Sequence, residues 1–258
     1  MKPTPRDHED FAHLAETARV ATEKKLPHFL HLDQAVGIWN YIRIANEIAD
    51  RNTPGRLLDW GCGFGQMTHL LRRRGFTVTP FDVGAADAPL PDVPLTRGLQ
   101  VMRSTHPTDL PFPAGAFDAV LSCGVLEHVD EFSEPGNEVR SLGEIRRVLT
   151  SRGVLLIYQL PQRYSSQEAI SRTLRLGYAH PRRFTAGEIR SLLARTGYRV
   201  VRLRRNNMLP KNLTGLPAPI RAFYSRFSLA LIRLDDALSV IPGLNQLAGV
   251  MEIVARPA

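Results

Sequence analysis

The chain has 258 residues, of which 43% are hydrophobic, and it carries a formal net charge of +8. It contains no apolar run near the ~18 residues that a membrane-spanning helix needs. Its first residues, MKPTPRDHEDFAHLAE, lack the apolar stretch of a signal peptide, and two cysteines, Cys62 and Cys123, are too few for a disulfide framework. We therefore expect a cytoplasmic protein with reduced thiols and a single domain over residues 1–258.

The apolar patterns predict short strands that alternate with helices. In chain order, the expected helices are 9–25, 33–50, 65–75, 135–153 and 185–197, and the expected strands are 56–60, 76–83, 117–124, 154–161, 198–208 and 250–257. Residues 84–108 are rich in proline and are expected to form a loop. Alternation at this spacing is typical of an α/β fold with a doubly wound, mostly parallel sheet.

Two segments lie outside this alternation. Residues 1–52 are expected to form an N-terminal helical cap, and residues 209–247 a helical insertion or lid before the last strand. Apolar residues recur in the insertion at helical spacing, together with arginines, at Ile220, Arg221, Phe223, Arg226, Phe227, Leu231, Arg233 and Leu234. This stripe has three interpretations: packing on the core, an apolar lid, or a basic amphipathic surface that contacts an anionic membrane.

The charge is unevenly distributed along the chain. Residues 1–150 hold 16 Lys/Arg and 20 Asp/Glu, a net charge of −4, and residues 235–258 hold 1 and 3, a net charge of −2. Residues 151–234 hold 16 and 2, a net charge of +14, and Lys211 is their only lysine. Because arginine grips carboxylate and phosphate groups in two places at once, this segment favours a partner with negative charge.

The stretch LLDWGCGFGQ (57–66) places glycines at alternate positions between a predicted strand and a predicted helix. Bare backbone there lets a ligand approach the N–H groups at the start of the helix. Gln66 stands where the dinucleotide fingerprint G-x-G-x-x-G has its third glycine. Asp82 ends the next strand, where a carboxylate can accept hydrogen bonds from the two hydroxyls of a ribose. The pattern indicates a nucleoside ligand without a pyrophosphate.

Four stretches resemble successive motifs of the class I S-adenosylmethionine-dependent methyltransferases. They are LLDWGCGFGQ, VTPFDV, TDLPFPAGAFDAVLSCGVLEHV and SLGEIRRVLTSRGVLLI, and the resemblance covers residues 33–208. It is strongest to the branch of ubiquinone-pathway O-methyltransferases and natural-product methyltransferases. The resemblance implies a Rossmann-like fold and S-adenosyl-L-methionine as the cofactor. The cofactor-binding residues that it implies are Asp59, Gly61, Cys62, Gly63, Gly65, Gln66, Asp82, Val83, Leu110 and Cys123.

The resemblance also implies what these residues bind. The end of the first strand and the glycine loop would hold the methionine part of the cofactor, Asp82 the ribose, and Val83 and Leu110 the adenine. One position departs from the family, because His106 stands where many members have an acid that contacts the adenine amino group.

Glu127 and His128 follow the fourth predicted strand and are the candidate catalytic residues. A hydroxyl nucleophile needs a base to take its proton, and the resemblance makes His128 a candidate base or, together with Glu127, a metal contact. The alternative is that both residues only begin a helix and bond to the backbone. The pair has no third ligand at a clear spacing, so no metal site is predicted.

The loops after the strand 154–161 are expected to face the acceptor. Residues 159–168 should cover the site, and the candidate substrate contacts are Arg163, Tyr164, His180 and Arg183. The alternatives are a solvated basic surface for the arginines and structural packing for Tyr164.

Together these features predict an enzyme that transfers a methyl group from S-adenosylmethionine to oxygen in a small or lipid-like acceptor. The basic segment favours an acceptor with an anionic end, or a peripheral contact with the membrane that holds it. RNA modification is an alternative suggested by the basic charge, but no RNA-binding module is recognisable, so nucleic acid is not the expected partner. Methyl transfer to a nitrogen or carbon atom of a natural product is a second alternative. A scaffold protein that binds the cofactor without catalysis is a third.

Overall fold

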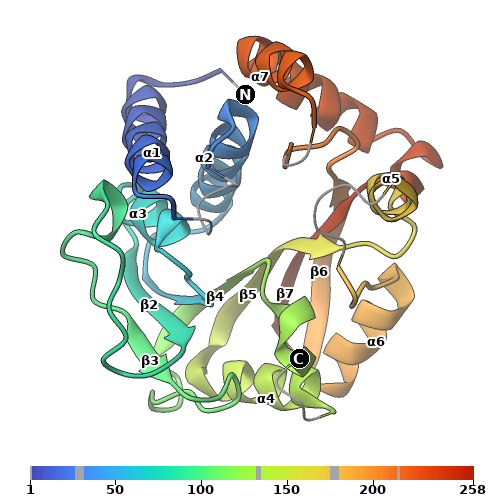
Figure 1. Cartoon of the computed structure of the whole chain (residues 1–258). Coiled ribbons are helices and arrows are strands. Elements are labelled where there is room, and N and C mark those ends of the chain that lie inside the picture. The colour runs from blue at the N-terminus through green and yellow to red at the C-terminus, as the bar shows by residue number, and fades with distance from the viewer. Residues whose placement is uncertain (1, 27–31, 132–134, 175–179, 214–215) are drawn as a thin grey trace.

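The sheet has seven strands in the order β3-β2-β1-β4-β5-β7-β6 (Figure 1). The computed structural model describes residues 2–26, 32–131, 135–174, 180–213 and 216–258. The strands are β1 (Arg56–Trp60), β2 (Thr77–Val83), β3 (Met102–Ser104), β4 (Phe117–Cys123), β5 (Leu149–Pro161), β6 (Tyr198–Asn206) and β7 (Val250–Pro257). Strands β1 to β5 pair in parallel, and β7 pairs antiparallel with both β5 and β6. The predicted doubly wound, mostly parallel sheet is confirmed.

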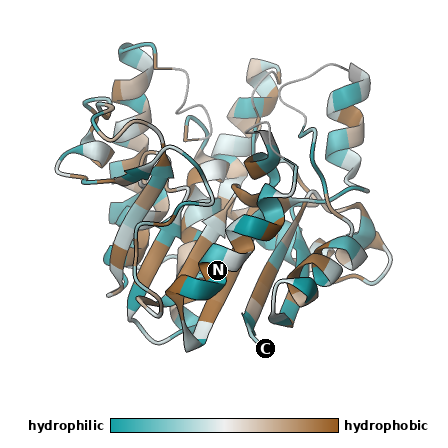
Figure 2. Ribbon diagram, turned by 90° about the horizontal axis from the view of Figure 1, so that it is seen from below, coloured by the Kyte–Doolittle hydropathy of each residue, from teal (hydrophilic) through white to brown (hydrophobic). Residues whose placement is uncertain are grey.

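Helices cover both faces of the sheet. They are α1 (Pro5–Glu23), α2 (Ala35–Arg51), α3 (Gln66–Arg72), α4 (Asn137–Val148), α5 (Ser166–Leu174), α6 (Ala186–Arg195) and α7 (Ala218–Ser239). Because successive side chains of a strand point to opposite faces, Leu57 packs in one buried cluster with α1, α2 and α3, and Leu58 packs in the other with α4 and α6. Brown, hydrophobic stretches accordingly run along the strands in Figure 2, between white and teal ones.

Two local predictions about the elements are wrong, and one helix was missed. The expected loop 84–108 contains a 3₁₀ turn, Pro94–Thr96, and the edge strand β3, which is too short to show a periodic pattern. The helix expected over 135–153 ends at Val148, and β5 begins at Leu149, so Gly153 lies inside a strand instead of ending a helix. Helix α5 was not predicted, because its only large apolar side chains are Ile170 and Leu174.

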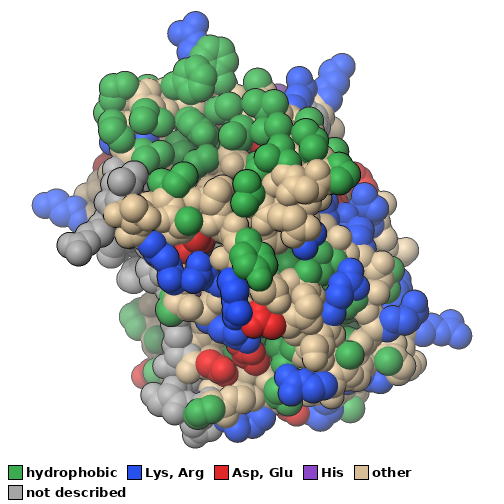
Figure 3. All heavy atoms as spheres, turned by 90° about the vertical axis from the view of Figure 1, so that its right-hand side faces the viewer, with side chains coloured by type: hydrophobic (Ala, Val, Ile, Leu, Met, Phe, Trp, Pro, Cys, Tyr) green, Lys and Arg blue, Asp and Glu red, His purple; other side chains and the backbone are tan. Residues whose placement is uncertain are grey.

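Residues 209–247 contain α7, which packs against α2 and β6. Apolar side chains gather over α7 at the top of the face shown in Figure 3, with basic side chains around them. No helix in the described ranges has the length and apolar character needed to cross a membrane. The division into a cap, a lid and one domain stays a prediction.

A buried ion network joins α2 to the antiparallel end of the sheet. Arg43 of α2 pairs with Glu252 of β7, and the two side chains are 5% and 0% exposed. Arg43 also pairs with Glu47 at 3.2 Å, and Glu47 in turn pairs with Arg202 and Arg204 of β6. Each charge in such a network needs its partner, because an uncompensated buried charge is costly.

We therefore expect Glu252→Ala to lower the free energy of unfolding by about 3–5 kcal/mol, since it leaves the buried Arg43 without its main partner. Urea denaturation measures this loss. Glu16→Ala is the control, because Glu16 pairs with Arg19 on the surface of α1 and should cost less than about 1 kcal/mol. Equal losses in the two variants would contradict the structural role of the network.

Candidate active site

The carboxyl ends of β2, β1 and β4 meet at one edge of the sheet, where the strand order reverses. The register places Trp60, the last residue of β1, beside the residues that precede Asp82 in β2 and Cys123 in β4. The glycine loop that begins at Gly61 therefore starts between these two strand ends. In open α/β sheets, ligands bind in the crevice at this switch point.

The three glycines of this loop all have backbone conformations that L side chains rarely adopt. The φ angles of Gly61, Gly63 and Gly65 are 75°, 54° and 88°. A Cβ atom added at Gly61 would lie 2.5 Å from Cγ2 of Val125, and one at Gly65 would lie 2.5 Å from Cδ2 of Leu99. A Cβ atom at Gly63 would meet no atom within 4 Å. The fold thus fills the space beside the outer glycines and leaves the space beside Gly63 for a ligand.

Asp82 is held by the backbone around it. The N–H of Gly63 donates to Oδ2 of Asp82, and the N–H of Val83 donates to Oδ1, both at 2.8 Å. Each carboxylate oxygen has a second lone pair, and the side chain is half-buried. Both oxygens can therefore accept a further hydrogen bond from a ligand hydroxyl.

Asp59 is a buried carboxylate under the same loop. It is 2% exposed, and its Oδ2 accepts a hydrogen bond from the hydroxyl of Thr68 at 2.6 Å. Burial, together with the negative charge of Asp82, raises the pKa of Asp59 to about 6, against the opposing effect of the Thr68 hydrogen bond. Little solvent screens this carboxylate, so its ionised form attracts a nearby cation more strongly than a surface acid does.

The other predicted cofactor residues differ in burial. Cys62 and Leu110 are buried, while Gln66, Val83 and Cys123 are half-buried. Burial raises the pKa of both thiols, so neither is a thiolate at neutral pH. The structure thus gives no support to a cysteine nucleophile.

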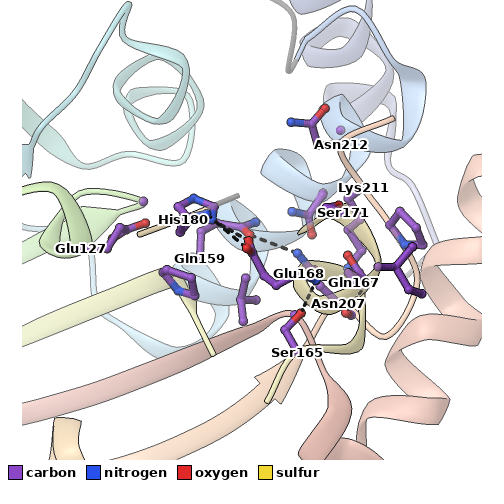
Figure 4. A pocket seen from close by; sticks show the side chains of 18 of the residues that line it. Glu127, Gln159, Ser165, Gln167, Glu168, Ser171, His180, Asn207, Lys211 and Asn212 are labelled. Atoms are coloured by element: carbon purple, nitrogen blue, oxygen red, sulfur yellow. Dashed lines mark hydrogen bonds and ion pairs between the residues drawn. The ribbon is translucent and has the colours of Figure 1, made fainter. Parts of the chain in front are cut away.

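A cavity of 370 Å³ lies at the carboxyl ends of β4 and β5 (Figure 4). Its walls come from α2, α5 and the segment between β6 and α7. Most of its lining side chains carry hydrogen-bonding groups, and these are Asn40, Tyr41, Glu127, His128, Gln159, Ser165, Gln167, Glu168, Ser171, His180, Asn207, Lys211 and Asn212. Tyr41 joins the cavity to the glycine loop, because its hydroxyl hydrogen-bonds Gln66.

Glu127, His128 and His180 come together on one side of this cavity. A carboxylate oxygen of Glu127 lies 3.9 Å from Nε2 of His128, and the ring centres of His128 and His180 are 5.8 Å apart. Nδ1 of His180 lies 2.7 Å from Oε1 of Glu168, and its backbone N–H donates to Oε2 at 3.1 Å. One ligand atom from each of the first three residues lies within 4.8 Å of the others, so the three could hold a metal ion. The sequence indicated Glu127 and His128 as a possible metal contact and His180 only as a candidate substrate contact.

The other three predicted substrate residues lie outside the cavity. Tyr164 is 61% exposed. Arg163 pairs with Glu188 of α6 at 2.6 Å, and Arg183 donates to the backbone oxygen of Arg163 at 3.4 Å. Their contact with a substrate stays a prediction that the cavity lining does not support.

Several lining residues were not found from the sequence. Tyr41 lies in an amphipathic helix, where an aromatic residue resembles core, and burial raises the pKa of its hydroxyl. Gln159 and Asn207 have φ angles of 59° and 65°, and Asn207 donates to Oε1 of Gln159 at 3.2 Å. Lys211 is buried 2.7 Å from Asp235, and burial lowers its pKa to about 8. Strained or buried polar groups of this kind gather at functional sites. Of these residues only Asn207 gives a signal in the sequence, because asparagine tolerates a positive φ angle.

A family model described as a methyltransferase domain matches residues 39–203, from α2 to β6. The chain belongs to this family. Over 137 residues it is 31% identical to the probable tRNA methyltransferase 9B of Bos taurus, covering 53% of this chain and 27% of that protein. Over 108 residues it is 32% identical to a ubiquinone biosynthesis O-methyltransferase of Caulobacter sp., covering 41% of this chain and 40% of that protein. The chain thus spans less than half the length of these curated relatives.

A solved structure matches the fold over the whole of this chain. The 1,6-didemethyltoxoflavin-N1-methyltransferase of Burkholderia thailandensis, with bound 1,6-didemethyltoxoflavin and S-adenosylhomocysteine, matches with a TM-score of 0.55 and 19% identity. The match covers 100% of this chain and 93% of that chain, and at this identity it shows a shared fold. Membership in the S-adenosylmethionine-dependent methyltransferases, predicted from the motifs, is confirmed.

Two glycine variants should separate folding from cofactor binding. Gly61→Ala should lower the free energy of unfolding by more than the roughly 1–2 kcal/mol of a left-handed residue, because its Cβ also collides with Val125. Gly63→Val should lower the free energy of unfolding by only about 1–2 kcal/mol. It should abolish S-adenosylmethionine binding, because the valine side chain enters the open space beside residue 63. Urea denaturation and titration calorimetry measure the two effects. Cofactor affinity within about threefold of wild type in folded Gly63→Val would contradict this assignment.

Proposed function

We propose that this methyltransferase transfers the methyl group of S-adenosylmethionine to a hydroxyl oxygen of a small polar acceptor bound in the cavity. In this proposal His128 takes the proton of that hydroxyl. The observation that carries the proposal is the cavity itself, because Tyr41 links it to the glycine loop and because it contains two histidines beside two carboxylates.

The residues of the glycine loop fit the cofactor. The open space beside Gly63 leaves backbone exposed to it, Asp82 has lone pairs for the ribose hydroxyls, and an ionised Asp59 would attract the positive charge of the methionine end. When bound, S-adenosylmethionine supplies a methyl group on a positively charged sulfur, which is transferred in line to the attacking atom.

The protein's own residues then have two tasks, to align the acceptor and to remove its proton. His128 lies at the cavity wall just past β4 and is 34% exposed on its side chain. Glu127 is buried 3.9 Å away and would stabilise the positive charge that His128 acquires. Glu168 fixes the ring of His180 through the 2.7 Å contact, so that His180 can orient the acceptor.

The lining of the cavity favours an acceptor with several hydrogen-bonding groups. Amide side chains line it at Asn40, Gln159, Gln167, Asn207 and Asn212. A buried polar group that finds no partner is costly, so an apolar body would bind poorly among these amides. In this proposal, a lipid-like acceptor enters only with its polar end.

Transfer of a labelled methyl group tests the proposed function. We expect purified protein, incubated with labelled S-adenosylmethionine and a small-molecule cell extract, to yield a low-mass labelled product whose new methyl is bound to oxygen. Mass spectrometry with fragmentation identifies that atom. A product methylated on nitrogen or carbon would overturn the oxygen assignment, and transfer to no acceptor would favour a cofactor-binding scaffold.

Replacing the base should slow the reaction without weakening cofactor binding. We expect His128→Ala to lower kcat by roughly 10²–10⁴-fold, the usual contribution of a general base, and to leave the Kd for S-adenosylmethionine nearly unchanged. His180→Ala should mainly raise the KM for the acceptor. Steady-state kinetics and titration calorimetry separate these effects.

Two controls make this test specific. His13→Ala changes a histidine of α1 outside the cavity, and it should leave kcat unchanged. A chelator distinguishes proton transfer from metal binding, because a His128 that ligates a metal cannot also take the proton. Loss of activity on chelation would replace the base assignment with a metal held by Glu127, His128 and His180.

Cofactor affinity should fall at acidic pH because of Asp59. Its pKa of about 6 in the protein alone means that the carboxylate is ionised above pH 6 and protonated below it. Because the cationic cofactor binds the ionised form, the Kd should rise by up to about tenfold per pH unit below pH 6. Calorimetry between pH 4.5 and about pH 8 measures this, and Asp59→Asn should bind weakly with a flat profile over the same range. An unchanged wild-type Kd down to about pH 5 would contradict the role of Asp59.

An RNA acceptor is the second candidate. The match to the probable tRNA methyltransferase 9B and the net charge of +14 over residues 151–234 favour it. Bulk tRNA added to the labelled reaction distinguishes the two functions, since label in purified tRNA that depends on His128 would favour the RNA acceptor.

A further inference from the structure

Helix α7 turns both polar and apolar residues towards the protein, including Tyr224 and Leu229, and leaves other large apolar residues exposed. Its buried residues are Ser228, Ile232, Asp235 and Ser239. Four of its large apolar residues are 42–53% exposed, and these are Ile220, Phe223, Phe227 and Leu234. A helix that only covers a core shows the opposite arrangement. The exposed face of α7 is therefore a candidate contact surface.

The outward residues form one stripe with a basic edge. Spacings of three and four residues put Ile220, Phe223 and Phe227 on one side of the first part of the helix, and the exposed Leu234 follows beyond a kink at Phe227. Arg226 stands just before the kink and Arg233 after it, and both are exposed. The apolar surface continues past the helix with Val240, Ile241 and Leu247, which are 44–65% exposed. Figure 3 shows the apolar side chains gathered over α7 with basic side chains at their border.

This surface is joined to the mouth of the cavity. The segment between β6 and α7 contributes Lys211 and Leu216 to the cavity wall. Asp235 of α7 accepts hydrogen bonds from Lys211 Nζ at 2.7 Å and from the backbone N–H of Leu209 at 2.7 Å. Ile170 of α5, which also lines the cavity, is 55% exposed. The α7 surface is thus connected to the cavity wall through the segment that joins β6 to α7.

We infer that α7 docks on an anionic membrane surface, with its apolar stripe among the lipid headgroups and its arginine edge against their negative charge. Interfacial helices combine an apolar face with basic residues in this way. The aliphatic members Ile220 and Leu234 have no π-face for a nucleic acid base to stack on, so the stripe suits lipid better than RNA. The inference does not depend on the acceptor, because it concerns binding and not methyl transfer.

Co-sedimentation with vesicles tests this docking. We expect the full chain to pellet with vesicles that contain phosphatidylglycerol and much less with vesicles of phosphatidylcholine alone. Salt at ~0.5 M should reduce the difference by screening the charges. Equal pelleting with the two lipids, or none with either, would overturn the inference.

Matched variants locate the contact on α7. The double variant Arg226→Gln with Arg233→Gln should bind the phosphatidylglycerol vesicles roughly tenfold or more weakly, because each arginine contributes about fivefold. Arg190→Gln with Arg195→Gln removes the same charge from exposed positions on α6 and should have little effect. Phe223→Ser with Phe227→Ser should abolish pelleting, and Met102→Ser with Val139→Ser, at exposed apolar positions elsewhere, should not. Similar losses in test and control variants would overturn the inference.

A fluorophore label reports the contact without removing any part of it. Ala230→Cys lies on α7 and Ala194→Cys on α6, both at exposed positions. We expect an environment-sensitive dye at 230 to shift to the blue with anionic vesicles, and the dye at 194 to stay unchanged. A stripe that instead forms a dimer, seen as a doubled mass that Phe223→Ser with Phe227→Ser abolishes, would overturn the inference. So would binding of bulk tRNA that requires Arg226 and Arg233 in a protein that does not bind vesicles.

Discussion

The register of β1 between β2 and β4 is the constraint on which the site depends. Because the three strands are parallel and end together, a loop, a carboxylate and a thiol from three distant parts of the sequence meet at Gly61, Asp82 and Cys123. Each of these three features is encoded by a short stretch of sequence. They form a binding surface only because they lie at the same edge of the sheet. A one-residue shift of a strand would turn its side chains to the opposite face and separate Asp82 from the N–H of Gly63.

Buried ion pairs hold elements around the cavity in place, as the strand register positions the glycine loop. The Arg43–Glu252 pair holds α2 against β7, and the Lys211–Asp235 pair holds the segment after β6 against α7. Lys211 lines the cavity itself, and α2 and β7, which the Arg43–Glu252 pair joins, both contribute lining residues, so ion pairs help to fix the cavity walls. Exchanging such pairs for apolar residues of similar size often preserves stability, but it would remove a charged group, Lys211, from the cavity lining.

The sequence predicts those features of the fold and site that depend on residues close together in the chain. The glycine loop, the strand-end Asp82 and the six longer strands follow local rules of spacing and composition, and the structure contains them. The cavity does not follow from such rules, because its wall combines residues from distant parts of the chain, from α2 to β7. Nothing local to His180 or Tyr41 indicates that they approach His128 or Gln66. The edge strand β3 and the helix α5 were missed for a related reason, since neither is long or periodic enough to be recognised without its packing partners.

The position of β7 has a consequence for synthesis of the protein. This strand lies between β5 and β6, yet it follows them in the chain and comes after the whole of α7. On the ribosome, β6 therefore has no neighbour to pair with, and β5 has one open edge, until residues 250–257 emerge. Unpaired edges of this kind promote aggregation, and here they coincide with an apolar stripe on α7. The nascent chain should thus need a chaperone most during the interval between completion of β6 and release of β7.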